Sequence, residues 1–107
     1  MTSSRKRRTG GVEWSARAVR DLEAIGDYIA SDNPRVAIDF VDGLIARGEA
    51  LAATPLVGRV VPEFGRTDIR EVLAGNYRIV YRVIERKICV LTIFEGHRQF
   101  GGLPNDE

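Results

Sequence analysis

The sequence has a single histidine and a single cysteine among its 107 residues. One histidine excludes a multi-histidine metal site. One cysteine excludes a disulfide within the chain and leaves a cysteine-based metal site without further ligands. Cys89 falls in an apolar run, so we expect a small buried residue on the core face of a strand. The glycines do not form a phosphate-binding spacing after a strand, and no serine-triad motif is present. The sequence therefore predicts neither a metal site nor a cofactor.

Long apolar runs are also missing, because none approaches the roughly 20 residues that a helix needs to span a bilayer. The N-terminus is basic, but no apolar stretch follows it, so it lacks the pattern of a secretory signal. We therefore expect a cytoplasmic protein with no membrane partner. The length fits one small domain with one core.

Basic charge gathers at the N-terminus. The formal net charge is +1, but residues 5–8 supply four of the 16 basic residues, which leaves 12 against 15 acidic residues elsewhere. The folded part is therefore not a generally basic nucleic-acid binder. Residues 1–10 are expected to form a disordered tail, with a nucleic-acid-binding or partner-binding arm as the alternative. Residues 11–100 form the predicted domain, and residues 101–107 a C-terminal tail.

Two amphipathic helices are predicted next to one another. The first follows Ser15, a good N-cap residue, and its apolar residues keep helical spacing as far as Ser31. The pair Asn33-Pro34 ends this helix and begins the second, because asparagine caps a helix and proline suits its first position. A second apolar stripe continues to Thr54-Pro55. Two such helices joined by a short turn form an αα-hairpin.

Short strands are expected on both sides of this hairpin. One lies before the first helix, at residues 11–14, and three follow the second, at residues 69–73, 77–84 and 88–94. Residues 56–68 are expected to form an extended surface loop. Consecutive hairpins give an antiparallel three-stranded sheet, and both helical stripes can be buried only against one of its faces. The predicted fold is a two-layer α+β domain with the order β-α-α-β-β-β.

The strand at residues 77–84 has two different faces. Its odd positions are apolar or aromatic, whereas Arg78 and Arg82 occupy even positions. Successive side chains of a strand point to opposite faces. We therefore expect one face in the core and a second face that displays both arginines.

Cationic side chains are the candidate functional residues. A guanidinium stays charged and offers a planar set of donors to phosphate, and a histidine transfers protons near neutral pH. The alternative is that the arginines pair with Glu71, Glu95 or a partner's acidic residues, and that the histidine has no catalytic role. The candidates are Arg70, Arg78, Arg82, Arg98 and His97.

A series of short motifs runs through the domain in a fixed order. They are Trp14-Ser15, Asp21-Leu22, Tyr28-Ile29-Ala30, Asn33-Pro34, Pro55-Leu56-Val57-Gly58-Arg59, Arg70-Glu71, the stretch 77–82 and the closing stretch 97–100. As a set, over about residues 12–100, they resemble the RelE/ParE superfamily of toxins from bacterial toxin–antitoxin pairs. The resemblance implies a toxin that halts growth until a co-expressed antitoxin wraps around it.

The superfamily has two functional branches. RelE-like members cleave messenger RNA on the ribosome, whereas ParE-like members inhibit DNA gyrase and lack the nuclease site. In the ribonuclease branch, Arg78 and Arg98 fall on the positions of two arginines that hold the scissile phosphate, and His97 would transfer a proton. Ile69 and Glu71 stand about where that branch often has lysines, and its late tyrosine is missing.

The motifs at residues 55–59 and 70–71 favour the ParE branch, although its frequent His-x-Arg-Arg ending reads Glu-Gly-His-Arg here. We therefore expect gyrase inhibition without a catalytic residue, with Arg70, Arg78, Arg82 and Arg98 as target-binding candidates. The alternatives are messenger-RNA cleavage and an inactive relative that only binds its antitoxin. An amphipathic antitoxin helix is expected to dock beside the two helices. The candidate docking residues are Leu22, Ile25, Ile29, Phe40 and Leu44.

Overall fold

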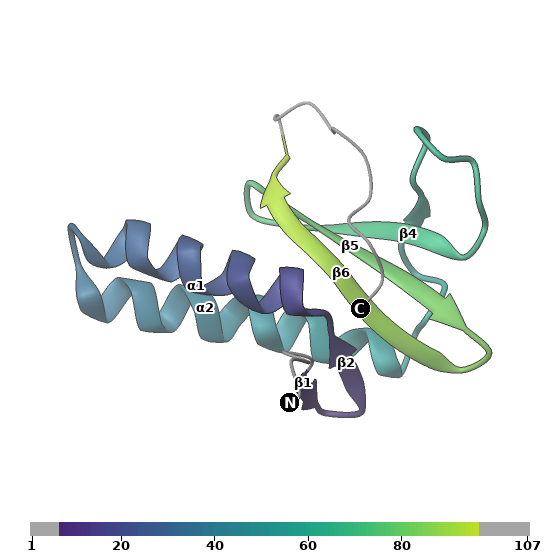
Figure 1. Cartoon of the computed structure of the whole chain (residues 1–107), viewed down its shortest axis with the longest axis horizontal. Coiled ribbons are helices and arrows are strands. Elements are labelled where there is room, and N and C mark those ends of the chain that lie inside the picture. The colour runs from purple at the N-terminus through teal and green to yellow at the C-terminus, as the bar shows by residue number, and fades with distance from the viewer. Residues whose placement is uncertain (1–6, 97–107) are drawn as a thin grey trace.

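Two helices stand between short strands at the N-terminus and longer strands at the C-terminus (Figure 1). The computed structural model describes residues 7–96, so His97 and Arg98 lie outside the described residues. The elements are β1 (Arg7–Thr9), β2 (Val12–Trp14), α1 (Ala16–Ala30), α2 (Pro34–Glu49), the 3-10 helix η1 (Ala50–Ala52), β3 (Arg59–Val60), β4 (Ile69–Ala74), β5 (Tyr77–Ile84) and β6 (Lys87–Glu95). This order confirms the predicted α+β fold and adds two short strands.

Both helices begin at the predicted caps. The Oγ atom of Ser15 accepts a hydrogen bond from the backbone N–H of Ala18 at 3.0 Å, and Oδ1 of Asn33 accepts one from the N–H of Val36 at 3.2 Å. Each cap satisfies a helix N–H that has no partner within the helix. The Ser15 hydroxyl also donates to the carbonyl of Leu91 at 2.8 Å, which ties the start of α1 to β6.

The sheet is larger and more mixed than the sequence predicts. It has six strands in the order β1-β2-β6-β5-β4-β3, and β2 runs parallel to β6 while the other pairs are antiparallel. The prediction of a purely antiparallel three-stranded sheet is therefore incomplete. β2 and β6 are separated in the chain by the helical hairpin and three further strands, and parallel neighbours require a long connection of this kind.

Two segments predicted to be irregular form edge strands. Residues 7–9, assigned to the N-terminal tail, pair with β2 because Gly10 and Gly11 make the turn with φ values of 55° and 82°. Glycine adopts such positive φ values without a steric penalty. Residues 59–60, assigned to a surface loop, pair with the start of β4. In a single sequence, two-residue and three-residue strands carry almost no periodic signal.

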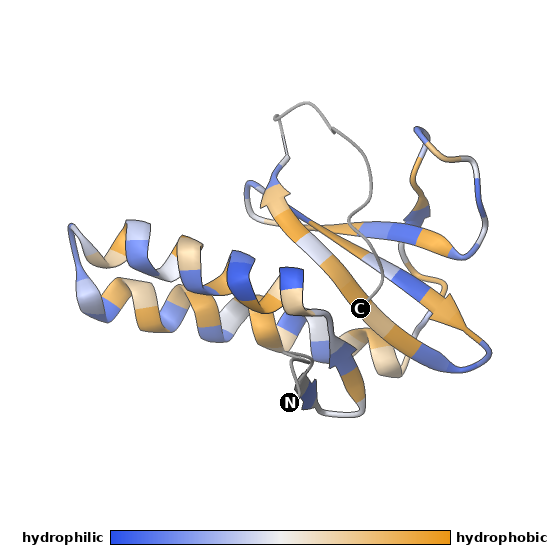
Figure 2. Cartoon of the chain, in the orientation of Figure 1, coloured by the Kyte–Doolittle hydropathy of each residue, from blue (hydrophilic) through white to orange (hydrophobic). Residues whose placement is uncertain are grey.

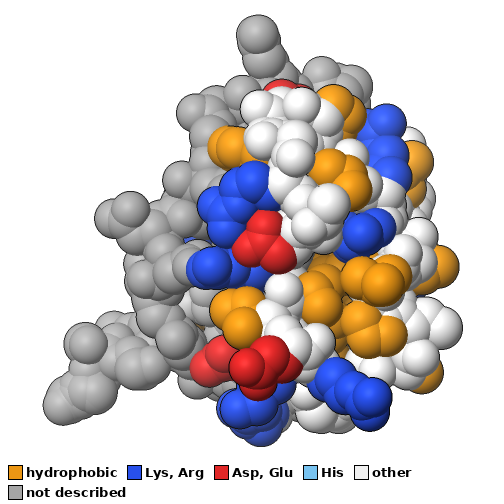
Figure 3. Space-filling view, turned by 90° about the vertical axis from the view of Figure 1, so that its right-hand side faces the viewer, with side chains coloured by type: hydrophobic (Ala, Val, Ile, Leu, Met, Phe, Trp, Pro, Cys, Tyr) orange, Lys and Arg blue, Asp and Glu red, His pale blue; other side chains and the backbone are white. Residues whose placement is uncertain are grey.

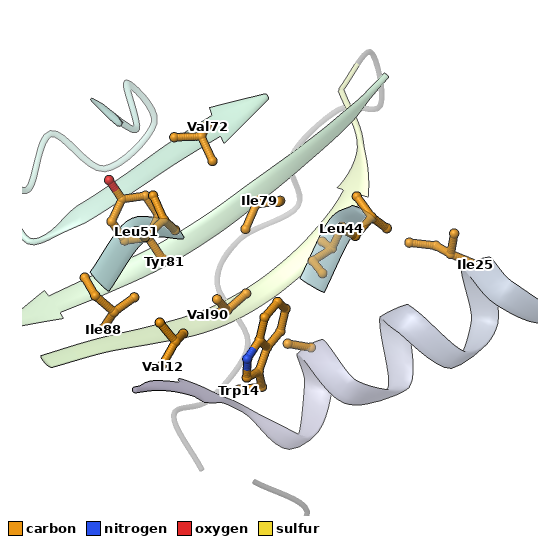
Figure 4. Close-up of a cluster of buried hydrophobic side chains, with 12 residues drawn as sticks. Val12, Trp14, Ile25, Leu44, Leu51, Val72, Ile79, Tyr81, Ile88 and Val90 are labelled. Carbon is orange, nitrogen blue, oxygen red and sulfur yellow. The ribbon is translucent and has the colours of Figure 1, made fainter. Parts of the chain in front are cut away.

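The main core lies between the helical hairpin and one face of the sheet (Figures 1 and 4). Trp14, Ile25, Leu44, Ile79 and Tyr81 all point into it, which confirms the odd positions of β5 as a core face. β6 is apolar along most of its length, whereas apolar and polar residues alternate in groups along β5 (Figure 2). A Cβ on Gly48 would lie 2.5 Å from the Trp14 ring, so α2 approaches that ring only because this position is glycine.

The second face of the sheet carries an apolar cluster of its own. Val61, Ile69, Val80 and Leu91 are buried there. Cys89 is half-buried and packs against this cluster, so its prediction as a residue of the main core face is wrong. The cause is an irregularity in the pairing, which passes from Val80↔Thr92 to Tyr81↔Val90 and so changes the alternation within β6.

Asp21 fixes α1 to this irregular part of β6. One of its carboxylate oxygens, Oδ2, accepts hydrogen bonds from the Thr92 hydroxyl at 2.6 Å and from the N–H of Ile93 at 2.9 Å. Beyond this point the two helices continue side by side past the edge of the sheet (Figure 1). In the part of the chain from 7 to 96, no helix is long and apolar enough to cross a membrane.

Candidate functional site

Arg78 lies inside the fold and not on its surface. Only 7% of the residue is exposed, although the strand pattern predicts a displayed side chain. Its Nε atom donates to Oε1 of Glu71 at 2.6 Å, and its Nη2 atom forms an ion pair with the same oxygen. The guanidinium carbon lies 5.1 Å from the centroid of the Phe94 ring. The prediction that Arg78 is displayed is therefore wrong, and the alternative prediction, pairing with Glu71, is confirmed.

Glu71 is shared between two arginines. Its residue surface is 3% exposed, and its second oxygen, Oε2, accepts from Nε of Arg59 at 2.5 Å. The Arg59 side chain is 67% exposed, so this ion pair joins the surface to the interior. A buried carboxylate is tolerated when it is paired and hydrogen-bonded. The position that the nuclease branch often fills with lysine here holds the counterion of Arg78.

Arg70 and Arg82 also make contacts within the chain. Arg70 donates to the carbonyl of Thr67 at 3.0 Å and to that of Gly58 at 2.9 Å. Arg82 donates from Nε to the Asp68 carboxylate at 3.2 Å. A hydrogen bond from Arg66 lowers the pKa of Asp68 from its usual value, and the hydrogen bond from Arg82 has a smaller effect in the same direction. These two target-binding candidates hold loops in place, and their side chains remain half-buried.

Charges of both signs are mixed on the end of the molecule that carries the loops between η1 and β4. Figure 3 shows arginine and lysine side chains beside carboxylates and apolar side chains on that face, with no continuous basic surface. Among residues 7–96, no group of three or more histidine, cysteine or acidic side chains is placed to hold a metal ion. The two remaining candidates, Arg98 and His97, lie outside the described residues.

The loop at residues 55–58 is held against β5 by Tyr81. The tyrosine hydroxyl accepts from the N–H of Gly58 at 2.9 Å and donates to the carbonyl of Pro55 at 2.8 Å. Burial raises the pKa of Tyr81, and the hydrogen bond from Gly58 opposes that rise. A Cβ on Gly58 would lie 2.5 Å from the tyrosine oxygen and 2.6 Å from the carbonyl oxygen of Glu71. No side chain fits there.

A groove of about 770 Å³ runs between the two helices. The helices pack closely at one point of its lining, where a Cβ on Gly26 would lie 3.3 Å from a methyl group of Val41. Three carboxylates, from Glu23, Asp27 and Asp42, border the groove. Its main apolar lining comes from Val19, Leu22, Ala30, Ile38, Val41 and Ile45. This surface has the length and polarity to receive an amphipathic helix.

Comparisons with known proteins show which family the chain belongs to. A family model described as the ParE toxin of the type II toxin–antitoxin system parDE matches residues 12–100. The chain belongs to the ParE toxin family. The predicted resemblance to the RelE/ParE superfamily, and the choice of its ParE branch, are confirmed.

Individual relatives agree with this assignment. The protein Y4kP of Sinorhizobium fredii, which is named as a toxin, is 37% identical over 100 residues, and the alignment covers 91% of this ParE toxin and 95% of Y4kP. A chain in the solved structure of the chromosomal ParDE toxin–antitoxin system of P. aeruginosa is similar with a TM-score of 0.65 and 22% identity. That match covers 81% of this chain and 98% of the other. At that identity, the similarity shows a shared fold.

Of the residues predicted to contact an antitoxin, one lines the groove and the others lie in the core or against it. Leu22 lines the groove. Ile25 and Leu44 are buried in the main core, with 9% and 2% of their surface exposed, so neither is available to a docked helix. Ile29 and Phe40 are half-buried and pack against the same core.

The sequence reasoning missed Ile38 and Ile45 as groove residues. Each lies one position after a core residue of α2, Ala37 or Leu44, and one position corresponds to a rotation of roughly 100° about the helix axis. The available signal was the width of the apolar surface of α2. A helix that buries only one face does not need apolar residues at positions 38 and 45 in addition to positions 37 and 44.

Proposed function

We propose that this ParE toxin arrests growth by inhibiting DNA gyrase and does not cleave messenger RNA. The observation that carries the proposal is the burial of Arg78 against Glu71. A phosphate clamp has to present an uncompensated guanidinium to its substrate. Here the charge of that guanidinium is already matched by a buried carboxylate, and Glu63 lies 3.7 Å from the same side chain.

Releasing Arg78 for a phosphate carries a high energetic cost. It would leave Glu71 as a buried carboxylate with Arg59 as its remaining partner. Breaking one side of a buried ion pair typically costs about 3–5 kcal/mol. A substrate phosphate would also approach the negative charge of Glu71 directly. A gyrase inhibitor has no such requirement, because it acts by binding and needs no catalytic residue.

An antitoxin is the partner that the helical groove supports best. Apolar side chains line the groove and Glu23, Asp27 and Asp42 border it. An amphipathic helix with lysine or arginine beside its apolar stripe would match both features. The solved structure that shares this fold comes from a toxin–antitoxin system, the chromosomal ParDE system of P. aeruginosa. We assign the groove to the antitoxin and place both partners in the cytoplasm.

The test is a pair of assays with the purified chain. Increasing amounts are added to a supercoiling reaction of DNA gyrase, and the same preparation is added to ribosomes that translate a defined messenger RNA. The proposal predicts loss of supercoiling with intact transcripts, and recovery of supercoiling when the co-encoded antitoxin is added. Cut transcripts together with normal supercoiling would sink it. Activity in neither assay, with the antitoxin still bound, would identify an inactive relative.

A further inference from the structure

Two large apolar side chains stand exposed next to one another on the loop at residues 55–58. Leu56 is 63% exposed and Val57 is 58% exposed. Single exposed apolar residues are common on protein surfaces and need no explanation. An adjacent pair on a loop is more informative when the loop backbone is fixed.

The backbone of this loop is fixed by side chains from two strands. Tyr81 of β5 contacts it at both Pro55 and Gly58. Arg70 of β4 donates to the carbonyls of Leu56, at 3.4 Å, and Gly58, at 2.9 Å. None of these hydrogen bonds involves the side chain of Leu56 or Val57. The loop is therefore ordered before any partner arrives, and preorganisation lowers the entropic cost of binding.

Two arginines lie at the loop, on an end of the molecule where charges of both signs are mixed. Arg59 lies two positions after Val57 with 67% of its side chain exposed, and Arg70 lies against the loop carbonyls. The carboxylate that pairs with Arg59, that of Glu71, is buried between two guanidinium groups. Residues 55–82 contain five basic and three acidic residues, whereas residues 16–49 contain four basic and seven acidic residues. The segment that carries the loop thus has an excess of basic residues, and the helical hairpin an excess of acidic residues.

We propose that Leu56 and Val57 form the surface by which this toxin binds its target, and that the target offers an apolar pocket bordered by carboxylates. The inference rests on the proposed function for the existence of a protein target. The apolar pair favours a protein over a nucleic acid, because a phosphate backbone offers no apolar pocket. The acidic border of the groove leaves that surface to a different partner.

The experiment compares a Leu56→Ser/Val57→Ser double variant with an Ile38→Ser control. Ile38 is also 63% exposed, but it lies in the helical groove. Thermal unfolding and circular dichroism establish that each variant is folded, and antitoxin binding is measured separately. Growth arrest after induction is the readout that does not depend on the identity of the target, and gyrase supercoiling is the readout that does.

The proposal predicts that the double variant loses growth arrest, needs at least tenfold more protein for half-inhibition of gyrase, and binds the antitoxin as the wild type does. Ile38→Ser should arrest growth as the wild type does and bind the antitoxin more weakly. A folded double variant that still arrests growth overturns the inference, as does one that loses only antitoxin binding. If the wild type arrests growth but leaves gyrase unaffected, the proposal that gyrase is the target is wrong. The growth assay then still tests whether Leu56 and Val57 bind the target. A wild type that arrests no growth overturns both proposals.

Discussion

Arg78 and Glu71 form an ion pair inside the fold, with 2.6 Å between Nε and Oε1 and with 7% and 3% of the two residues exposed. Arg59 approaches the other carboxylate oxygen from the surface. The arginine that the sequence presents as the best phosphate ligand is thus paired with a carboxylate of the adjoining strand β4, two positions before its own cross-strand partner Leu73. The proposal of a binding toxin without nuclease activity rests on this pairing.

Glu71→Gln should destabilise the protein strongly. The variant keeps the shape of the side chain but removes the charge that compensates buried Arg78, which typically costs about 3–5 kcal/mol. Urea unfolding followed by circular dichroism measures the loss. Glu63→Gln is the matched control, because Glu63 is 43% exposed and 3.7 Å from the same guanidinium, so its loss should cost less than about 1 kcal/mol. Equal stabilities of the two variants would contradict the buried pairing.

Gly58→Ala should also destabilise the protein, by about 1–3 kcal/mol, because the added Cβ meets the Tyr81 oxygen and the Glu71 carbonyl. Gly43→Ala is its control. A Cβ at that position of α2 meets nothing within 4 Å. Alanine favours a helix by about 1 kcal/mol over glycine, so this control should be slightly more stable than the wild type. Melting curves of both variants decide the point, and a Gly58→Ala protein that melts with the wild type would show that the loop does not pack as described.

Tyr81→Phe should loosen the loop at residues 55–58. Removing the hydroxyl leaves the Gly58 N–H and the Pro55 carbonyl without their partner, which typically costs about 1–3 kcal/mol. Hydrogen exchange of the Gly58 amide should become faster. Tyr28→Phe serves as the control, because Tyr28 is 78% exposed. Unchanged exchange at Gly58 would argue against the tyrosine as the anchor.

We expect the protein to lose stability at high pH because Tyr81 is buried. Burial raises the pKa of Tyr81 above its ordinary value of 10.0. The stabilisation is therefore complete below pH 10 and is lost as the pH rises from there through the pKa of the folded state, because the unfolded chain releases its proton first. Unfolding free energies from about pH 8 to about pH 11 should fall more steeply for the wild type than for Tyr81→Phe. Parallel curves would be inconsistent with a raised pKa.

Ile38→Glu should weaken antitoxin binding at least tenfold, or about 1.4 kcal/mol, and leave stability nearly unchanged. Ile38 lines a groove that already has three acidic residues at its border, so a further carboxylate adds both a desolvation cost and charge repulsion. Leu73→Glu is the control, since Leu73 is 64% exposed and does not line the groove. Calorimetric titration with the antitoxin provides the affinities. Equal weakening by both substitutions would mean that the groove is not the docking site.

The sequence was informative where local interactions decide the structure. The caps at Ser15 and Asn33 and the hairpin turn before Tyr77 are local features, and each appears as predicted. Whether Arg78 is exposed or buried depends on which carboxylate the pairing of β4 and β5 brings near it. The periodicity of one strand does not show which residues of the next strand lie opposite. The position of Cys89 depends in the same way on an irregular pairing between β5 and β6.

The candidate site was predictable only in part for the same reason. An apolar stripe shows that a helix packs against something, but it does not show which side meets the sheet and which remains open. Ile25 and Leu44 were therefore chosen for the groove and lie in the core, while Ile38 lies in the groove. The helix crossing at Gly26 sets this division, and it results from packing between two segments.

The central claim is that Arg78 serves the fold and that this toxin acts on gyrase. The most direct test replaces the buried pair by Glu71→Met/Arg78→Met, since apolar replacement of a buried ion pair is often neutral or stabilising. Arg59 keeps its contact with solvent in this variant. We predict that the folded double variant inhibits gyrase supercoiling as the wild type does, with messenger RNA intact on translating ribosomes. A wild type that cleaves messenger RNA, together with a folded double variant that does not, would contradict the account.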